Sequence, residues 1–393
     1  MTSSATRSTR SGLPPIHGHE ELRQALVLAH ARDRLPRVLL LHGRPGIGKQ
    51  RMAQWIGQLL VCVEPGSEGP CGACRECLLA LRIEHPDLHW FMPLPRPKAR
   101  GSREREDEAL EEARIEWIEE ARRTPFRPSH QTELRGLQIG TIRNLRKRVG
   151  RGAGTGGRQL YLVADAEELV AQEASQEAAN ALLKTLEEPP RGTWMVLTSS
   201  EPGRLLDTIR SRTTPLHLTG LSEPVLRRVL EEEVGAEPSE AARAARLAGG
   251  SIGRALGLLP SGEEPGPLEV VRQDAFHLLR AALQDSPGPR FAKAMSYPAS
   301  GARTLTELFS ALEVWLRDLG AARAGSGSAI LNQDAAPWLT RQAEELPLDP
   351  SGPSRALRCV QEAREQAAGN VNPQLLLTGL LTAMHRELRH DRS

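Results

Sequence analysis

Residues 38–50 read VLLLHGRPGIGKQ, which is an apolar run, a glycine-rich turn and a lysine. A short continuous apolar run suits a strand that is buried on both faces of a parallel sheet. The apolar pattern from Met52 to Leu60 predicts a helix directly after the turn. Strand, glycine-rich turn and helix in this order are the setting of a phosphate-binding loop, in which backbone N–H groups and a lysine contact phosphate oxygens.

The turn nearly satisfies the pattern G-x4-G-K-[S/T], so its candidate nucleotide-binding residues are Gly43, Gly46, Gly48 and Lys49. The next residue departs from the pattern. Gln50 replaces the hydroxyl that normally coordinates magnesium, and a carboxamide offers a different geometry. The loop therefore leaves ATP binding open and argues against productive placement of magnesium.

A second strand, predicted at 159–164, should end in an aspartate that orients the metal and a glutamate that activates water. Residues 162–167 read LVADAE, so the natural register puts Ala164 in the metal-side position and Asp165 in the position of the base. A slip of one residue would make Asp165 a metal ligand, but it would turn the strand's side chains to the opposite faces. We therefore expect no efficient hydrolysis, and a relic loop that only shapes the fold is the alternative to a nucleotide site.

Cysteines gather in one short segment, with spacing C-x8-C-x2-C-x2-C, at Cys62, Cys71, Cys74 and Cys77. Four thiolates complete a closed tetrahedral zinc shell, which leaves no position for water. An odd total of 5 cysteines argues against a disulfide scaffold. The spacing predicts a structural zinc ion, with buried unligated thiols as the alternative. Cys359 stands alone and is expected to be a core residue.

Strand and helix patterns alternate through the first half of the chain and predict a parallel α/β domain over 14–218, after a disordered tail at 1–13. Its further predicted elements are helices at 16–34, 139–149, 173–188 and 205–212 and strands at 194–197 and 216–218. A zinc module at 62–77 and a charged, solvated helical insertion at 96–135 interrupt it. Beyond residue 222 no strand pattern appears, which predicts helical domains at 219–262 and 263–393.

The composition of the chain argues against several classes of protein. Hydrophobic residues make up 39% of the 393 residues, which is enough for real cores. A net charge of +2 and 3% aromatic residues argue against a zinc-dependent protein that binds nucleic acid by itself. No apolar run reaches about 18 residues, so no membrane span is predicted. The first residues lack the apolar core of a secretory signal, and we expect a cytoplasmic protein.

The chain resembles the δ′ subunits of bacterial DNA polymerase III clamp loaders in five features that follow one another along the sequence. The first two are the phosphate loop and the four-cysteine module. The other three are the motifs HPD at 85–87, ANALLKTLEEPP at 179–190 and IRSR at 209–212. The resemblance covers roughly residues 14–260, and residues 370–381 resemble the family's closing helix. The insertion at 96–135 is longer than the family pattern.

The resemblance implies an α/β AAA+ module (a parallel sheet flanked by helices, with an inserted zinc module), a helical lid at 219–262 and an all-α collar at 263–393. It implies a hetero-oligomer with γ/τ and δ subunits that loads a sliding clamp on primer–template DNA, as part of the DNA polymerase III holoenzyme. Family δ′ subunits are poor or inactive ATPases that act as a stator. An active γ/τ-like ATPase motor is the alternative.

The resemblance also gives Arg212 a role. In this family an S-R-C motif supplies an arginine to the ATP site of the adjacent subunit, and here it reads Ser211-Arg212-Thr213. From the residues alone, the favoured interpretation of Arg212 is a solvated arginine at a helix end, and the family motif reverses this preference. Active relatives also carry G-S-x-R in the lid, whereas Arg254 here is displaced by one position.

Overall fold

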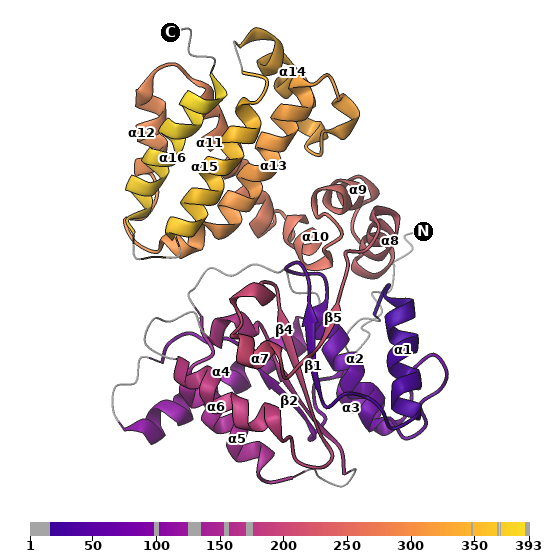
Figure 1. Cartoon of the computed structure of the whole chain (residues 1–393). Coiled ribbons are helices and arrows are strands. Elements are labelled where there is room, and N and C mark those ends of the chain that lie inside the picture. The colour runs from indigo at the N-terminus through magenta and orange to yellow at the C-terminus, as the bar shows by residue number, and fades with distance from the viewer. Residues whose placement is uncertain are drawn as a thin grey trace. The chain divides into compact units, whose positions relative to one another are not determined.

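The computed structural model describes residues 16–97, 102–124, 135–152, 157–169, 176–346, 349–367, 369 and 371–389. The chain forms two compact units (Figure 1). Of the described residues, those up to 124, those between 135 and 238 and those at 249–253 form the first unit, and those at 239–248 and from 254 onward form the second. The predicted tail at 1–13 lies outside the described residues, and the predicted boundaries at 219 and 263 stay predictions.

The first unit is built on a parallel sheet with the strand order β2-β3-β4-β1-β5. Its strands are β1 (Val38–His42), β2 (Leu88–Phe91), β3 (Gln159–Val163), β4 (Thr193–Ser199) and β5 (Thr214–His217). The apolar run that opens the sequence analysis forms β1, which pairs with β4 and β5 and is therefore internal. The strands predicted from apolar runs are confirmed as β1, β3, β4 and β5.

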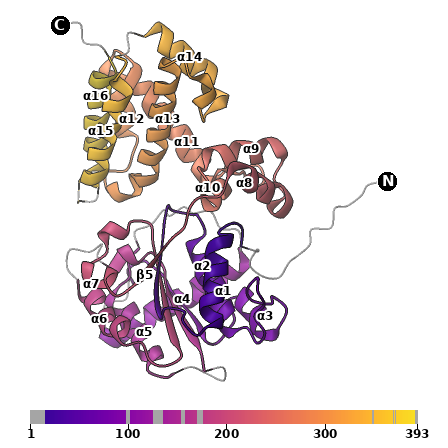
Figure 2. The same cartoon turned by 45° about the vertical axis from the view of Figure 1, so that its right-hand side comes forward.

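Helices cover both faces of this sheet (Figure 2). Leu39 and Leu41 face one core with α1 and α2, whereas Val38 and Leu40 face the other with α5, α6 and α7. This alternation is the period of two expected of a strand. The helices of this unit are α1 (Glu20–Ala31), α2 (Lys49–Val61), α3 (Arg75–Leu81), α4 (Arg103–Arg123), α5 (Ile139–Val149), α6 (Gln176–Glu187), α7 (Asp207–Arg210) and α8 (Glu223–Val229), followed by a π-helix (Leu230–Val234).

The charged insertion contains the helix α4, as predicted, but this helix is not solvated all round. Leu110 and Ala121 belong to the core beside α2. Asp107 is buried and accepts hydrogen bonds from Arg143 of α5, with both Nε contacts at 3.1 Å, and from Lys147. Burial alone would raise the pKa of Asp107, but these two cations outweigh it and lower the pKa. Part of the insertion is thus a structural layer against α5.

The elements named in the described residues of the second unit are all helices, and the mostly helical character predicted for 269–390 is confirmed there. Its helices are α9 (Pro238–Leu247, whose first residue belongs to the first unit), α10 (Ile252–Leu258, whose first two residues do), α11 (Pro267–Leu283), α12 (Pro287–Met295), α13 (Thr306–Arg323), α14 (Ala336–Glu345), α15 (Gly352–Ala367) and α16 (Pro373–Leu388). Its core gathers leucine side chains around Trp315 and Phe309 of α13. Cys359 packs against this core, as expected.

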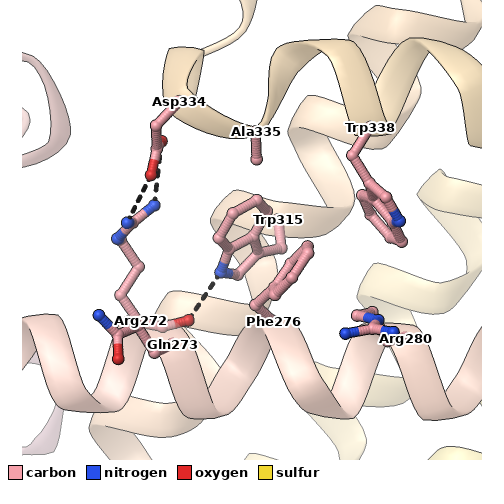
Figure 3. Close-up of a pocket in the computed structure, with 8 residues that line it drawn as sticks. All are labelled: Arg272, Gln273, Phe276, Arg280, Trp315, Asp334, Ala335 and Trp338. Atoms are coloured by element: carbon pink, nitrogen blue, oxygen red, sulfur yellow. Dashed lines mark hydrogen bonds and ion pairs between the residues drawn. The ribbon is translucent and has the colours of Figure 1, made fainter.

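An aromatic cluster joins α11, α13 and α14 of the second unit (Figure 3). The Phe276 ring lies 4.8 Å from both the Trp315 and Trp338 rings, and Trp315 Nε1 donates to the carbonyl of Arg272 at 2.9 Å. The Arg272 guanidinium binds Asp334 Oδ2 at 2.7 Å. The cluster lines a surface cavity of about 520 Å³.

None of the helices described here is long and apolar enough to cross a membrane.

Candidate functional site

The predicted phosphate loop lies where β1 ends and α2 begins, at the carboxyl edge of the parallel sheet, which is the usual place for ligands in such sheets. Gly43 follows β1 directly with φ of 151°. A Cβ atom there would lie 2.4 Å from the carbonyl oxygen of Leu218. The sheet therefore requires glycine at this position for packing as well as for conformation.

Lys49 is turned into its own loop. Its side chain is buried at 5% exposure. The ammonium donates to the carbonyls of Gly43 and Arg44, both at 2.9 Å, and to Ser200 Oγ at 2.8 Å. A lysine ammonium has three N–H donors, so these three bonds use all of them. A phosphate oxygen would have to displace one of these partners to reach Lys49.

The segment at 251–253 donates hydrogen bonds to the rest of the phosphate loop. Ser251 Oγ donates to the carbonyl of Pro45 and the Gly253 N–H donates to that of Gly46, both at 2.9 Å. Together with the bonds from Lys49, four successive carbonyls from 43 to 46 therefore accept hydrogen bonds. Arg254, the displaced lid arginine, binds Glu307 Oε2 at 2.7 Å.

The carboxylates near Lys49 differ from those of a working site. Ala164 is buried and offers no oxygen. Asp165 has φ of 48°, and burial followed by the nearby Glu167 raises its pKa to about 6, while Lys49 lowers it in part. Glu167 accepts from the Ser200 N–H at 2.8 Å through Oε1. Its Oε2 is buried without a hydrogen-bond partner in the part of the chain that the structure describes.

The four predicted metal ligands come together. The Sγ atoms of Cys62, Cys71, Cys74 and Cys77 all lie within 4.8 Å of one another, and those of Cys71 and Cys77 are 3.9 Å apart. Zinc–sulfur bonds of about 2.3 Å in a tetrahedron place sulfurs about 3.8 Å apart. The donor set and spacing therefore fit a tetrahedral metal ion, although no ion is part of this structure.

Backbone groups around the cysteines favour thiolates. Three of the sulfurs accept N–H groups, from Cys71 to Cys62 at 3.3 Å, from Cys74 to Cys71 at 3.3 Å and from Cys77 to Cys74 at 3.4 Å. The N–H groups of Cys74 and Ala73 lower the pKa of Cys71 to about 6, whereas burial raises the pKa of Cys62 and of Cys77. Since metal ligands must be deprotonated, Cys71 suits a metal centre as it stands, and a bound cation would stabilise the thiolates of the two buried cysteines.

The cysteine centre is anchored to the phosphate-loop helix and to the sheet. Cys62 directly follows α2 as its C-cap residue. Gly69 has φ of 121°, and a Cβ there would lie 2.6 Å from the Trp55 ring of α2. His85, from the HPD motif, pairs with Glu76 of α3 through Nε2 at 2.9 Å and accepts the Asp87 N–H through Nδ1 at 3.1 Å. This histidine thereby connects the module to β2.

Arg212 lies just beyond α7 on the surface. Its guanidinium binds Glu187 Oε1 through Nε at 2.8 Å and Nη2 at 2.7 Å, and Nη1 donates to the Thr208 carbonyl at 2.8 Å. The side chain remains 34% exposed. The arginines near it are paired locally, Arg210 with Asp207 and Arg204 with Glu201.

Residues 18–222 match the model of a protein family described as "DNA polymerase III, delta subunit". The DNA polymerase III subunit delta' of Escherichia coli is 28% identical over 93% of this chain and 94% of its own length. The chain is a member of the delta' family of DNA polymerase III clamp-loader subunits. The delta' subunit of Pseudomonas aeruginosa is 33% identical over 63% of each chain. The tau subunit of Escherichia coli is 27% identical over 74% of this chain but 39% of its own.

Within this delta' family member, several functional contacts were missed by sequence reasoning. Ser200 and Ser251 reach the phosphate loop from residues far along the chain, and the sequence carries no local signal for either. Strand β2 was missed too, because its sequence LHWF is short and carries His89, which stacks on Tyr161 at 4.6 Å. Glu187 lies in the LEEPP run, and its local sequence carries no signal for its contact with Arg212.

Proposed function

We propose that this chain is a non-hydrolysing delta'-type subunit that lends Arg212 to the ATP site of a neighbouring clamp-loader subunit. The observation that carries the proposal is a contrast between two basic groups. The three N–H donors of Lys49 are bonded to two carbonyls of its own loop and to Ser200, whereas Arg212 is held at the surface of the same unit.

The phosphate loop supports the first half of the proposal. Gln50 supplies no hydroxyl and Ala164 supplies no carboxylate, so both protein ligands that would place magnesium are missing. Asp165 follows β3 in a left-handed conformation, and its raised pKa of about 6 keeps part of the population protonated near neutral pH. Nucleotide held at this site would serve as a structural ligand rather than a substrate.

Arg212 supports the second half. A guanidinium delivered in trans stabilises the charge that grows on a transferred phosphoryl group, an effect of about 10³–10⁵ in rate in well-studied NTPases. Planar and permanently charged, it can bind phosphate oxygens through two N–H groups at once. The replacement of the motif's cysteine by Thr213 leaves this charged member in place.

The four cysteines complete the proposal as a structural zinc site. A zinc ion bound there supplies cross-links and no open coordination position, because four sulfurs fill its shell. It would fix the loop between α2 and α3, and through Cys62 it would fix the end of the phosphate-loop helix. We assign the remaining parts by family, as an AAA+ module with a helical lid and a collar for assembly. The proposed partners are tau/gamma and delta subunits, and through them the clamp and primed DNA.

Reconstitution tests the proposal. The chain is combined with the tau/gamma and delta subunits of its own organism, and ATP turnover is measured with primed DNA and clamp. We expect Arg212→Ala to assemble normally and to slow turnover, and Arg210→Ala, the matched control, to behave as the parent. Unchanged turnover in Arg212→Ala would rule out the lent arginine.

The chain purified without its partners tests the alternative of an ATPase motor, which the similarity to a tau subunit raises. A motor would turn over ATP as an isolated chain, with stimulation by primed DNA. The proposal predicts no turnover above that of the Lys49→Ala variant.

A further inference from the structure

The ion pair that holds Arg212 is made by tertiary structure. Glu187 is the last residue of α6, and Arg212 follows α7, so the two residues are 25 positions apart in the sequence. Leu186, next to Glu187, and Ile209, three residues before Arg212, are buried in one core at 2% and 0% exposure. The backbones that carry the carboxylate and the guanidinium are therefore fixed relative to each other.

The contacts of Arg212 hold its guanidinium from two sides. Nε and Nη2 share Oε1 of Glu187 on one edge, and Nη1 reaches the Thr208 carbonyl and, at 3.3 Å, Ser211 Oγ on the other. A guanidinium has five N–H donors. These contacts leave one N–H of Nη2 without an acceptor among the residues that the structure describes.

The other arginines of this region differ from Arg212 in this respect. Arg204 and Arg210 each pair with an acidic residue three positions earlier in the sequence, as on any helical surface. Arg212 instead takes its partner from another helix. A long side chain that is free in solvent samples many rotamers, so orienting it at the moment of reaction costs entropy.

We propose that Glu187 is a positioning residue for Arg212. It holds the guanidinium in one orientation at the surface, so that the arginine meets a neighbouring subunit's nucleotide already aligned. This inference rests on the proposed function of Arg212. Both partners of the pair are partly exposed, at 34% and 45%, and exposed pairs are weak. A polyphosphate can therefore add its own hydrogen bonds to the guanidinium without paying to break a buried ion pair.

Glu187→Gln tests the inference in the reconstituted assembly. The amide removes the charge but keeps the side chain's size. We expect kcat for ATP to fall about three- to tenfold, because the arginine is present but less well aligned, while KM for ATP stays the same. Glu188→Gln is the matched control. Glu188 is the adjacent residue, and its exposed side chain makes no ion pair among the described residues.

A double-variant comparison separates positioning from a general structural role. If Glu187 acts through Arg212, Glu187→Gln changes nothing further in an Arg212→Ala assembly. A loss of the same size in that background would overturn the inference, as would a rise in kcat, which would make Glu187 a restraint. If Arg212→Ala slows turnover but Glu187→Gln matches the parent, the inference fails and the lent arginine stands. If Arg212→Ala itself is silent, both fail.

Discussion

Two basic side chains of the α/β unit, Lys49 and Arg212, differ in burial and in hydrogen-bond partners. Lys49 is 5% exposed and donates to two carbonyls of its own loop and to Ser200, whereas the Arg212 side chain is 34% exposed and shares a carboxylate at the surface. The buried cation is used for folding, and the exposed one remains accessible to a partner. This contrast is the basis of the proposal that the chain does not hydrolyse ATP itself but lends an arginine to a neighbouring subunit.

The acidic groups follow the same division. Asp165 and Glu167 interact with Lys49, whose pKa is lowered mainly by burial. One oxygen of Glu167 has no hydrogen-bond partner in the described residues. Glu187 lies at the surface beside an arginine that no other acidic residue of the described chain contacts. Buried charges are costly to rearrange and exposed pairs are not, so the surface pair is the more adaptable one.

Removal of zinc should have the largest effect on local stability. It should loosen the cysteine module and leave the surface around Arg212 unchanged. Zinc binding to such sites is worth on the order of 10 kcal/mol. Since Cys62 is the C-cap residue of α2, chelation is expected to raise amide hydrogen exchange in α3 and at the end of α2, while α7 keeps its protection.

Metal analysis supplies the control for this experiment. Cys359→Ser should retain one zinc ion per chain, because Cys359 lies in the other unit, and Cys77→Ser should lose it. Protein purified without chelators that contains no zinc would contradict the assignment of the metal.

Restoration of the missing carboxylate by Ala164→Asp should destabilise the fold. Ala164 is 1% exposed, and the new charge would join Asp165 and Glu167. We expect a loss of about 3 kcal/mol or more in the free energy of unfolding, larger at pH 8 than at pH 5, and no ATP turnover by the isolated chain. Denaturant unfolding measures this loss, and Ala164→Asn separates charge from size. Turnover in Ala164→Asp would show that one substitution had disabled the site.

Asp165→Asn should give a smaller, pH-dependent stabilisation. The pKa of Asp165 is about 6 in the fold and 3.8 in its ordinary state, so the native state binds more protons between these values and stability falls as pH rises through this window. Asparagine removes that cost and tolerates φ of 48°.

We therefore expect Asp165→Asn to gain about 1–3 kcal/mol at pH 7.5 and to lose this gain near pH 4. Melting curves at both pH values measure it. Glu168, whose pKa is raised to about 7 by burial, keeps part of the pH dependence in the variant. An equal effect at both pH values would show that ionisation of Asp165 is not the cause.

Periodic and local features of this chain could be predicted from sequence. The apolar runs gave the strands β1, β3 and β4, and the spacing of Ile139, Ile142 and Leu145 gave the bounds of α5. Cysteine spacing identified thiols that the structure brings within 4.8 Å of one another. In each case, residues close in sequence carry the whole signal.

Contacts between distant segments could not be predicted in this way. Ser200 meets Lys49 across 151 residues, and Glu187 meets Arg212 across 25. Nothing in the local pattern of either segment specifies its partner, because the pairing depends on strand order and helix packing. Gln50 and Ala164 indicate from sequence that two magnesium ligands are missing. They do not indicate that Lys49 donates hydrogen bonds to the carbonyls of its own loop.

The most direct test places the two basic groups side by side in one assay. Assemblies that carry Lys49→Ala or Arg212→Ala in this chain are checked for intact subunit composition and compared for ATP turnover with primed DNA. The account predicts that Lys49→Ala stays within about twofold of the parent while Arg212→Ala loses the turnover of the adjacent site. A large loss in Lys49→Ala together with parental turnover in Arg212→Ala would contradict it.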